Sequence, residues 1–98
     1  MRMRFLPEAE SELMDAAHWY RKQAEGLDHE FMRCVDEALA RISRAPQLFP
    51  LVHGPVRRTL IKRFPYAIFF AQAQGDILVY AVFHTRRNPR RLEKRKKQ

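Results

Sequence analysis

The sequence predicts an α+β fold in which an N-terminal helical hairpin packs on one face of a small, mainly antiparallel sheet, in the order β-α-α-β-β-β. Two stretches between residues 7 and 45 repeat apolar residues at 3.6-residue spacing. Residues 56–84 are rich in β-branched and aromatic side chains, and turn signals separate the segments. With 98 residues, 46% of them hydrophobic, the chain is long enough for one domain with a core.

The first predicted elements are a short strand and a helix. Residues 2–6 alternate between polar and apolar side chains, as a strand does. Pro7 suits the first helical position, and the glutamates at 8, 10 and 12 follow it, where the helix dipole favours negative charge and where we expect them to be solvated. Gly26 is expected to end the helix in the left-handed conformation. The buried stripe of this helix consists of Ala9, Leu13, Ala16, Ala17, Tyr20 and Ala24.

A second helix follows, with Asp28 as its expected N-cap and Pro46 just beyond its end. Cys34 lies on its core side and is expected to be a small buried hydrophobe. Trp19 of the first helix has two interpretations: it packs the helix on the sheet, or it serves a partner surface. The buried stripe of the second helix consists of Phe31, Val35, Ala38, Leu39 and Ile42.

The pattern of the residues after the second helix predicts a loop followed by strands. Residues 46–55 contain three prolines and a glycine and are expected to form a loop. Strands are predicted at 56–62, 66–72 and 77–84, with a hairpin turn at 74–76. The last strand is apolar at nearly every position, which predicts a central strand covered on both faces. We expect the sheet face away from the helices to expose apolar surface, from Phe69 or Phe70, until a partner covers it.

The charge of the chain is strongly asymmetric. The formal net charge is +8, made up of −2 over residues 1–45 and +10 over residues 46–98. The second half is therefore expected to meet an anionic partner such as RNA, DNA, the ribosome or an acidic protein; the alternative is a solvated basic surface. We expect a domain at 1–90 and a basic, partly disordered tail at 91–98. The cationic run at 94–97 either strengthens nucleic-acid contact or only solubilises the chain end.

Several functional classes are not predicted. No run of about 18 apolar residues exists, so no membrane association is expected, and the first residues do not resemble a signal peptide. A single cysteine, Cys34, cannot form an internal disulfide, which suits the reducing cytoplasm. His18, His29 and His53 lack metal-ligand spacing, so neither a metal nor another cofactor is expected.

A series of short motifs carries a family resemblance over residues 5–91. In order and spacing they resemble the RelE/ParE superfamily of bacterial type II toxin–antitoxin systems, and its ParE or plasmid-stabilisation branch more than its RelE branch. The motifs are Phe5-x-Pro7-Glu8-Ala9, Ala16-x-x-Trp19-Tyr20, Gly26-Leu27-x-x-x-Phe31, Pro46-x-x-Phe49-Pro50, Val56-Arg57-Arg58, Arg63-Phe64-Pro65-Tyr66-x-Ile68 and His84-x-Arg86-Arg87-x-Pro89.

The resemblance implies the RelE/ParE toxin fold and a cognate antitoxin that wraps the toxin in a hetero-oligomer. ParE-like members inhibit DNA gyrase and have not kept nuclease residues, so the first expectation is a toxin that binds gyrase and is not an enzyme. RelE-like members cut mRNA in the ribosome without metal, which is the alternative. The residues expected to contact the target or nucleic acid are Arg57, Arg58, Lys62, Arg63, Arg86, Arg87, Arg90 and Arg91.

Under the endoribonuclease alternative, metal-free cleavage requires proton transfer and cations around the phosphate. The candidate catalytic residues are Arg58, Arg63, His84 and Arg86, with the arginines holding phosphate and His84 moving a proton. Similar nucleases carry a tyrosine or a lysine cluster near the end of the last strand, whereas residues 86–98 contain no tyrosine. The other interpretation of His84 is a strand-end histidine bonded to the backbone.

Overall fold

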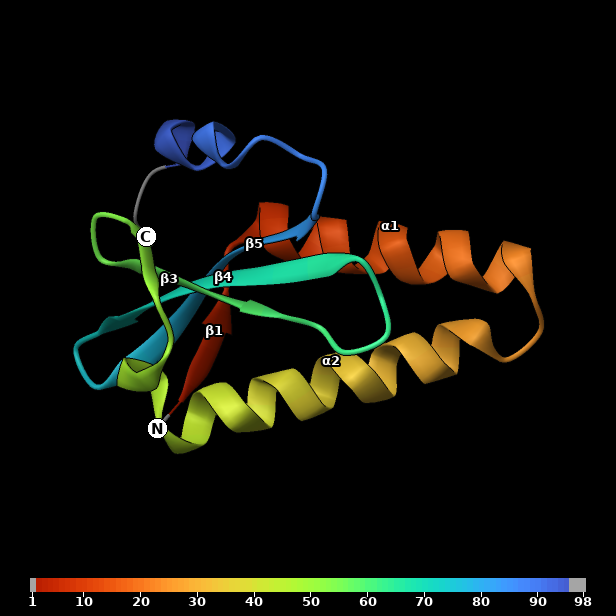
Figure 1. Ribbon diagram of the computed structural model, residues 1–98, viewed down its shortest axis with the longest axis horizontal. Helices are drawn as coiled ribbons and strands as arrows, with labels where there is room; N and C mark the ends of the chain where they lie inside the picture. The colour runs from red at the N-terminus through yellow and green to blue at the C-terminus, as the bar shows by residue number, and fades with distance from the viewer. Residues whose placement is uncertain (1, 96–98) are drawn as a thin grey trace.

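The computed structural model describes residues 2–95 and confirms the predicted fold class. Two helices form a hairpin that packs on a five-stranded sheet (Figure 1). The elements are β1 (Met3–Phe5), α1 (Pro7–Gln23), α2 (Leu27–Arg44), the 3-10 helix η1 (Pro46–Leu48), β2 (Leu51–His53), β3 (Val56–Leu60), β4 (Tyr66–Ala73), β5 (Asp76–His84) and the 3-10 helix η2 (Pro89–Lys94). Among these residues, no helix is long and apolar enough to cross a membrane.

The sheet has the strand order β1-β5-β4-β3-β2, in which only the β1–β5 pair is parallel. Residues 77–83 of β5 are all buried, which confirms the predicted central strand. β1 is short, however, and pairs with β5 only from Ile77 to Val79. Within residues 2–95, the outer edge of β5 from Tyr80 onward therefore has no neighbouring strand, and its backbone groups need other partners.

The predicted helical stripes are confirmed for the most part. The chain reverses earlier than predicted: α1 ends at Gln23, and this leaves Ala24 exposed. Gly26, with φ +82°, then precedes α2 directly, so Gly26 and not Asp28 is the N-cap residue. Cys34 is half-buried, whereas full burial was predicted. Ala17 and Leu39 are half-buried, and the buried stripe residues are Ala9, Leu13, Ala16 and Tyr20 of α1 and Phe31, Val35, Ala38 and Ile42 of α2.

The prediction of a loop at residues 46–55 is incomplete, because this segment contains η1 and β2. β2 is an edge strand of three residues that pairs Leu51 with Arg57 and His53 with Val56. All three residues of β2 are exposed. A strand so short, between two prolines and without a buried face, produces no periodicity that sequence reasoning can detect.

The prediction that Phe69 or Phe70 is exposed on an open sheet face is wrong, although Leu60 of β3, on the face away from the helices, is 54% exposed. Phe70 faces the helices and is fully buried, with its ring against Phe49 of the η1 segment. Phe69 lies on the other face beside Phe83, yet only 4% of it is exposed. The chain after β5 folds back over the molecule, and Leu92 of η2 joins the core with 3% exposure. The protein's own C-terminal segment thus covers the face that was expected to await a partner.

This segment places the predicted domain boundary inside a regular element. Residue 90 lies within η2, whose first turn Asn88 caps by accepting a hydrogen bond from the backbone N–H of Arg90. Figure 1 shows η2 at the end of the molecule away from the α1–α2 turn. Within residues 86–95, Leu92 is buried and residues 86–91 are exposed, whereas residues 96–98 of the predicted tail lie outside the described residues.

The β4–β5 turn provides a test of the hairpin. Its two central residues, Gln74 and Gly75, have φ values of +54° and +81°, as a type I′ turn requires. A Cβ at Gly75 meets no atom within 4 Å, so Gly75→Ala adds only backbone strain. We expect it to lower the free energy of unfolding by about 1 kcal/mol. Gln74→Asn, at the adjacent position, is expected to raise it, because asparagine tolerates positive φ. Urea unfolding measures both, and a Gly75→Ala protein as stable as the parent would contradict the assignment.

Candidate functional site

The cations predicted around β3 have different environments. Arg57 donates hydrogen bonds to the carbonyl oxygens of Gln47 and Phe49, at 3.2 and 2.6 Å, and so fixes the η1 segment to the sheet. Arg58 pairs with Phe69 in the β3–β4 register and is exposed on the face away from the helices. Lys62 is exposed, with its Nζ 3.9 Å from a carboxylate oxygen of Glu37. Of these three, Arg57 has a structural role.

Arg63 lies in the β3–β4 connection with a positive φ of +72°. Its guanidinium is 3.1 Å from a carboxylate oxygen of Glu30 in the first turn of α2. Arg33 also contacts Glu30, and the hydrogen bond from Arg33, with a smaller contribution from Arg63, lowers the pKa of Glu30 below its ordinary value. Arg63 thus connects the β3–β4 turn to the helical hairpin, on an exposed surface.

The cations after β5 form the other predicted group. Arg86, Arg90 and Arg91 are exposed, and they follow one another in the turn after β5 and in η2. Arg87 differs, because it bonds to Glu12 at 3.0 Å and its guanidinium lies 4.8 Å from the centre of the Phe83 ring. The three exposed arginines, here called the arginine segment, are therefore available to an anionic partner.

His84 ends β5 and is half-buried. Its Nδ1 accepts a hydrogen bond of 3.1 Å from the backbone N–H of Arg86, and its ring stacks edge-on against Tyr66 at 5.3 Å. His84 pairs with Tyr66 across the sheet, while Arg58 pairs with Phe69, three residues further along β4. Because side chains alternate along a strand, His84 and Arg58 project from opposite faces. Of the four candidate catalytic residues, His84 and Arg86 are in contact, through the hydrogen bond from the backbone N–H of Arg86 to His84.

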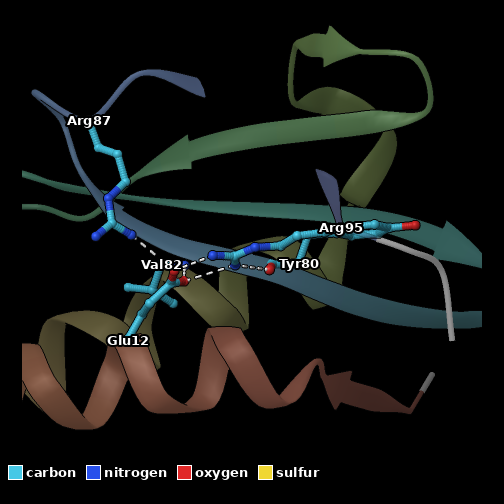
Figure 2. A network of polar contacts seen from close by, with 5 residues as sticks. All are labelled: Glu12, Tyr80, Val82, Arg87 and Arg95. Atoms are coloured by element: carbon cyan, nitrogen blue, oxygen red, sulfur yellow. Dashed lines mark hydrogen bonds and ion pairs between the residues drawn. The ribbon is translucent and has the colours of Figure 1, made fainter. Parts of the chain in front are cut away.

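A carboxylate that was predicted to be solvated organises this part of the molecule (Figure 2). Glu12 of α1 accepts hydrogen bonds from the backbone N–H of Val82, at 3.0 Å, and from the guanidinium of Arg87, also at 3.0 Å. Arg95 donates to the same carboxylate and to the carbonyl oxygen of Tyr80, at 2.7 Å. Only 15% of the Glu12 side chain is exposed. We call this group the Glu12 network.

The Glu12 network satisfies the free edge of β5. The Val82 N–H and the Tyr80 carbonyl are backbone groups that a neighbouring strand would normally bind, and here side chains bind them. Sequence reasoning missed Glu12 and Arg95. The available signal was the position of Glu12, three residues after Ala9 and four before Ala16, which places it on the buried face of α1.

A cleft with a volume of about 570 Å³ opens beside the network, between α1 and the end of the sheet. Asp15, Trp19 and Tyr20 line it from the helix, while Tyr66 and His84 line it from the sheet. Burial raises the pKa of both tyrosines above their ordinary value. Trp19 is 54% exposed, which favours its interpretation as a partner surface over simple packing. The remaining lining residues are Glu12, Ala16, Pro65, Val82 and Arg87.

Within residues 2–95, no three or more histidine, cysteine, aspartate or glutamate side chains gather closely enough to hold a metal ion. The polar groups that line the cleft include the carboxylates of Glu12 and Asp15, the guanidinium of Arg87, the imidazole of His84 and two tyrosine hydroxyls.

Comparison with known proteins identifies the class to which this fold belongs. A solved structure described as the chromosomal ParDE TA system from P. aeruginosa has a chain that matches 86% of this protein and 95% of its own length, with a TM-score of 0.70 at 16% sequence identity. At that identity the match establishes the fold, which is the one found in a toxin–antitoxin system. No curated protein matches the sequence.

The family follows from the sequence itself. The family described as ParE toxin of type II toxin–antitoxin system, parDE, matches residues 3–89, which is nearly the whole chain. The protein therefore belongs to the ParE toxins of type II toxin–antitoxin systems. This membership confirms the predicted resemblance and its ParE branch, and it implies an antitoxin as partner.

Removing the charge of Glu12 tests the Glu12 network. Glu12→Gln keeps the shape of the side chain but leaves Arg87 and Arg95 without a partner anion at a mostly buried position. We expect the free energy of unfolding to fall by about 2–3 kcal/mol. Glu10→Gln, two residues earlier and exposed, is the matched control and should cost no more than about 0.5 kcal/mol. Equal effects of the two variants in chemical denaturation would show that the Glu12 network is not stabilising.

Proposed function

We propose that this ParE toxin arrests growth by binding DNA gyrase through its arginine segment, and that a cognate antitoxin neutralises it. The proposal rests on which of the predicted cations are exposed and which are engaged in structural contacts. Arg86, Arg90 and Arg91 are exposed together after β5, whereas Arg57 and Arg87 have structural partners. An exposed cationic segment on a protein of net charge +8 favours encounter with an anionic surface such as a gyrase–DNA complex.

The geometry of the candidate catalytic residues supports a binding inhibitor over a nuclease. Arg58 and His84 project from opposite sheet faces, and Arg63 is paired with Glu30. For catalysis, the phosphate-binding arginines and the residue that transfers the proton must reach the same phosphate group. In the described structure, Arg58 and His84 cannot converge on one phosphate without a rearrangement of the sheet.

The charge of the toxin also indicates the kind of antitoxin that fits it. The partner should carry an acidic segment that can cover the arginine segment, because like charges there would oppose binding and opposite charges speed association. Such a complex would be a toxin–antitoxin hetero-oligomer. A short acidic open reading frame next to this gene is the expected source, and its co-expression should restore growth to cells that the toxin alone arrests.

Supercoiling by purified gyrase tests the proposed target. The toxin should abolish supercoiling of relaxed plasmid or trap cleaved DNA. Arg91→Glu should weaken this inhibition by about tenfold, because it reverses a charge within the contact surface. Arg21→Glu, on the exposed last turn of α1, changes the net charge by the same amount and should inhibit almost as well as the parent. Equal losses in both variants would point to net charge and not to the arginine segment.

A ribosome assay distinguishes the alternative activity. Ribosome-bound mRNA incubated with the toxin should remain intact. Cleavage that His84→Ala or Arg63→Ala abolishes would establish an endoribonuclease and refute the gyrase proposal. Growth that is unaffected by expression of the toxin alone would refute both activities.

A further inference from the structure

The cleft beside the Glu12 network contains a continuous aromatic wall. The ring of Trp19 contacts Tyr20 with a centroid distance of 5.1 Å, Tyr20 contacts Tyr66 at 6.1 Å, and Tyr66 contacts His84 at 5.3 Å. These four residues all line the same cleft. The wall therefore leads from the exposed indole on α1 to the imidazole at the end of β5. Its rings meet edge to face, so a flat ligand would stack on one ring at a time, and the indole of Trp19 is the most exposed.

The polar groups of the cleft come in two kinds from two sides. The helix contributes the carboxylate of Asp15, which can accept hydrogen bonds from a ligand, whereas both oxygens of the Glu12 carboxylate are already engaged in the Glu12 network. The end of β5 and the turn after it contribute the guanidinium of Arg87 and the imidazole of His84. The Nδ1 of His84 accepts the backbone N–H of Arg86, so the neutral ring carries its proton on Nε2 and is a donor there. A ligand between the two sides meets acceptors and donors.

The charge balance excludes a simple ion as the best occupant. Two carboxylates and one guanidinium line the cleft, and Arg95 adds a second guanidinium to Glu12. Within the cleft these charges cancel, so neither a free cation nor a free anion is favoured there. Outside it, the arginine segment begins two residues after His84 and is strongly cationic. The site thus favours a flat, uncharged, hydrogen-bonding group that is attached to a separate anionic group outside the cleft.

We propose that this cleft binds a nucleobase, stacked on the aromatic wall, while Arg86, whose backbone N–H bonds to His84 at the cleft, holds the attached phosphate. A heteroaromatic base combines a π-face with donors and acceptors on its edge, and proteins recognise bases by stacking and edge hydrogen bonds. The volume of about 570 Å³ lies within the range of small-ligand sites, and a base is small enough to enter it. The proposal goes beyond gyrase inhibition, which needs only a protein contact, and it can hold or fail independently.

The single tryptophan of the chain makes this proposal directly testable, because Trp19 lies in the wall itself. Each of the four ribonucleoside monophosphates is titrated into the protein while Trp19 fluorescence is recorded. We expect saturable quenching by at least one of them and none by ribose 5-phosphate, which has the phosphate without the base. Quenching that is absent up to millimolar nucleotide, or equal for ribose 5-phosphate, would overturn the proposal.

Matched variants on α1 separate the cleft from the general surface. Asp15→Ala removes an acceptor and should weaken nucleotide binding about tenfold, whereas Glu10→Gln outside the cleft should not. Trp19→Ala, followed by calorimetry, should weaken binding about tenfold or more. Met14→Ala is its control, because Met14 is a 64% exposed apolar residue of the same helix outside the cleft. Equal effects within either pair would place the binding elsewhere.

Further titrations identify the source of the base. Stronger quenching by a single-stranded oligonucleotide than by its monophosphates would indicate an unstacked base in a strand, and equal affinity would indicate a free nucleotide; both results support the proposal. Oligonucleotide binding that leaves Trp19 fluorescence unchanged would mean contact with the backbone alone and would contradict it. So would an acidic, tyrosine-containing peptide that quenches Trp19 at lower concentration than every nucleotide, because the cleft would then be a protein-docking site.

Discussion

The architecture depends on how the outer edge of β5 is completed. β1 pairs with this strand only as far as Val79, which leaves the backbone groups of Tyr80 and Val82 at the sheet edge. Buried backbone groups without partners are costly, and an open strand edge also invites pairing with other chains. The Glu12 carboxylate and the Arg95 guanidinium bind these groups in place of a strand. One helix, the central strand and the C-terminal segment therefore meet at a single carboxylate.

That arrangement divides the arginines of the second half into structural and available groups. Arg87 and Arg95 reach Glu12, and their guanidiniums also lie within 5 Å of the Phe83 ring centre, at 4.8 and 4.9 Å. They thereby cover both the edge and the outer face of β5. The number of lysines and arginines in residues 46–98 consequently overstates the number of unpaired cations that a partner can reach. Among the described residues after β5, the arginines that are exposed and form no ion pair are Arg86, Arg90 and Arg91, which is why the binding proposal rests on them and not on the whole basic half.

The fold was predictable from the sequence where side-chain periodicity reflects burial. Both helices have such periodicity, the long strands are rich in β-branched and aromatic residues, and Gly75 in the β4–β5 turn suits its positive φ. β2 was not predictable, because an exposed edge strand of three residues buries nothing. The covered outer face was missed for a different reason. The segment after β5 is dominated by arginine and lysine, a composition that predicts solvent exposure, and a single buried leucine, Leu92, gives no periodic signal.

The candidate site was predictable by residue type but not by arrangement. Sequence reasoning identified His84 and the arginines, because histidine and arginine are the residues that bind and act on anions. It could not show that Arg58 and His84 project from opposite faces, since that depends on the register between β3, β4 and β5. Nor could it show that His84 closes an aromatic wall with Trp19, 65 positions earlier in the chain. The incomplete pairing of β5 explains why Trp19 and His84 lie near each other. Where β1 stops, α1 approaches β5 directly, and the cleft forms between the helix and the strand.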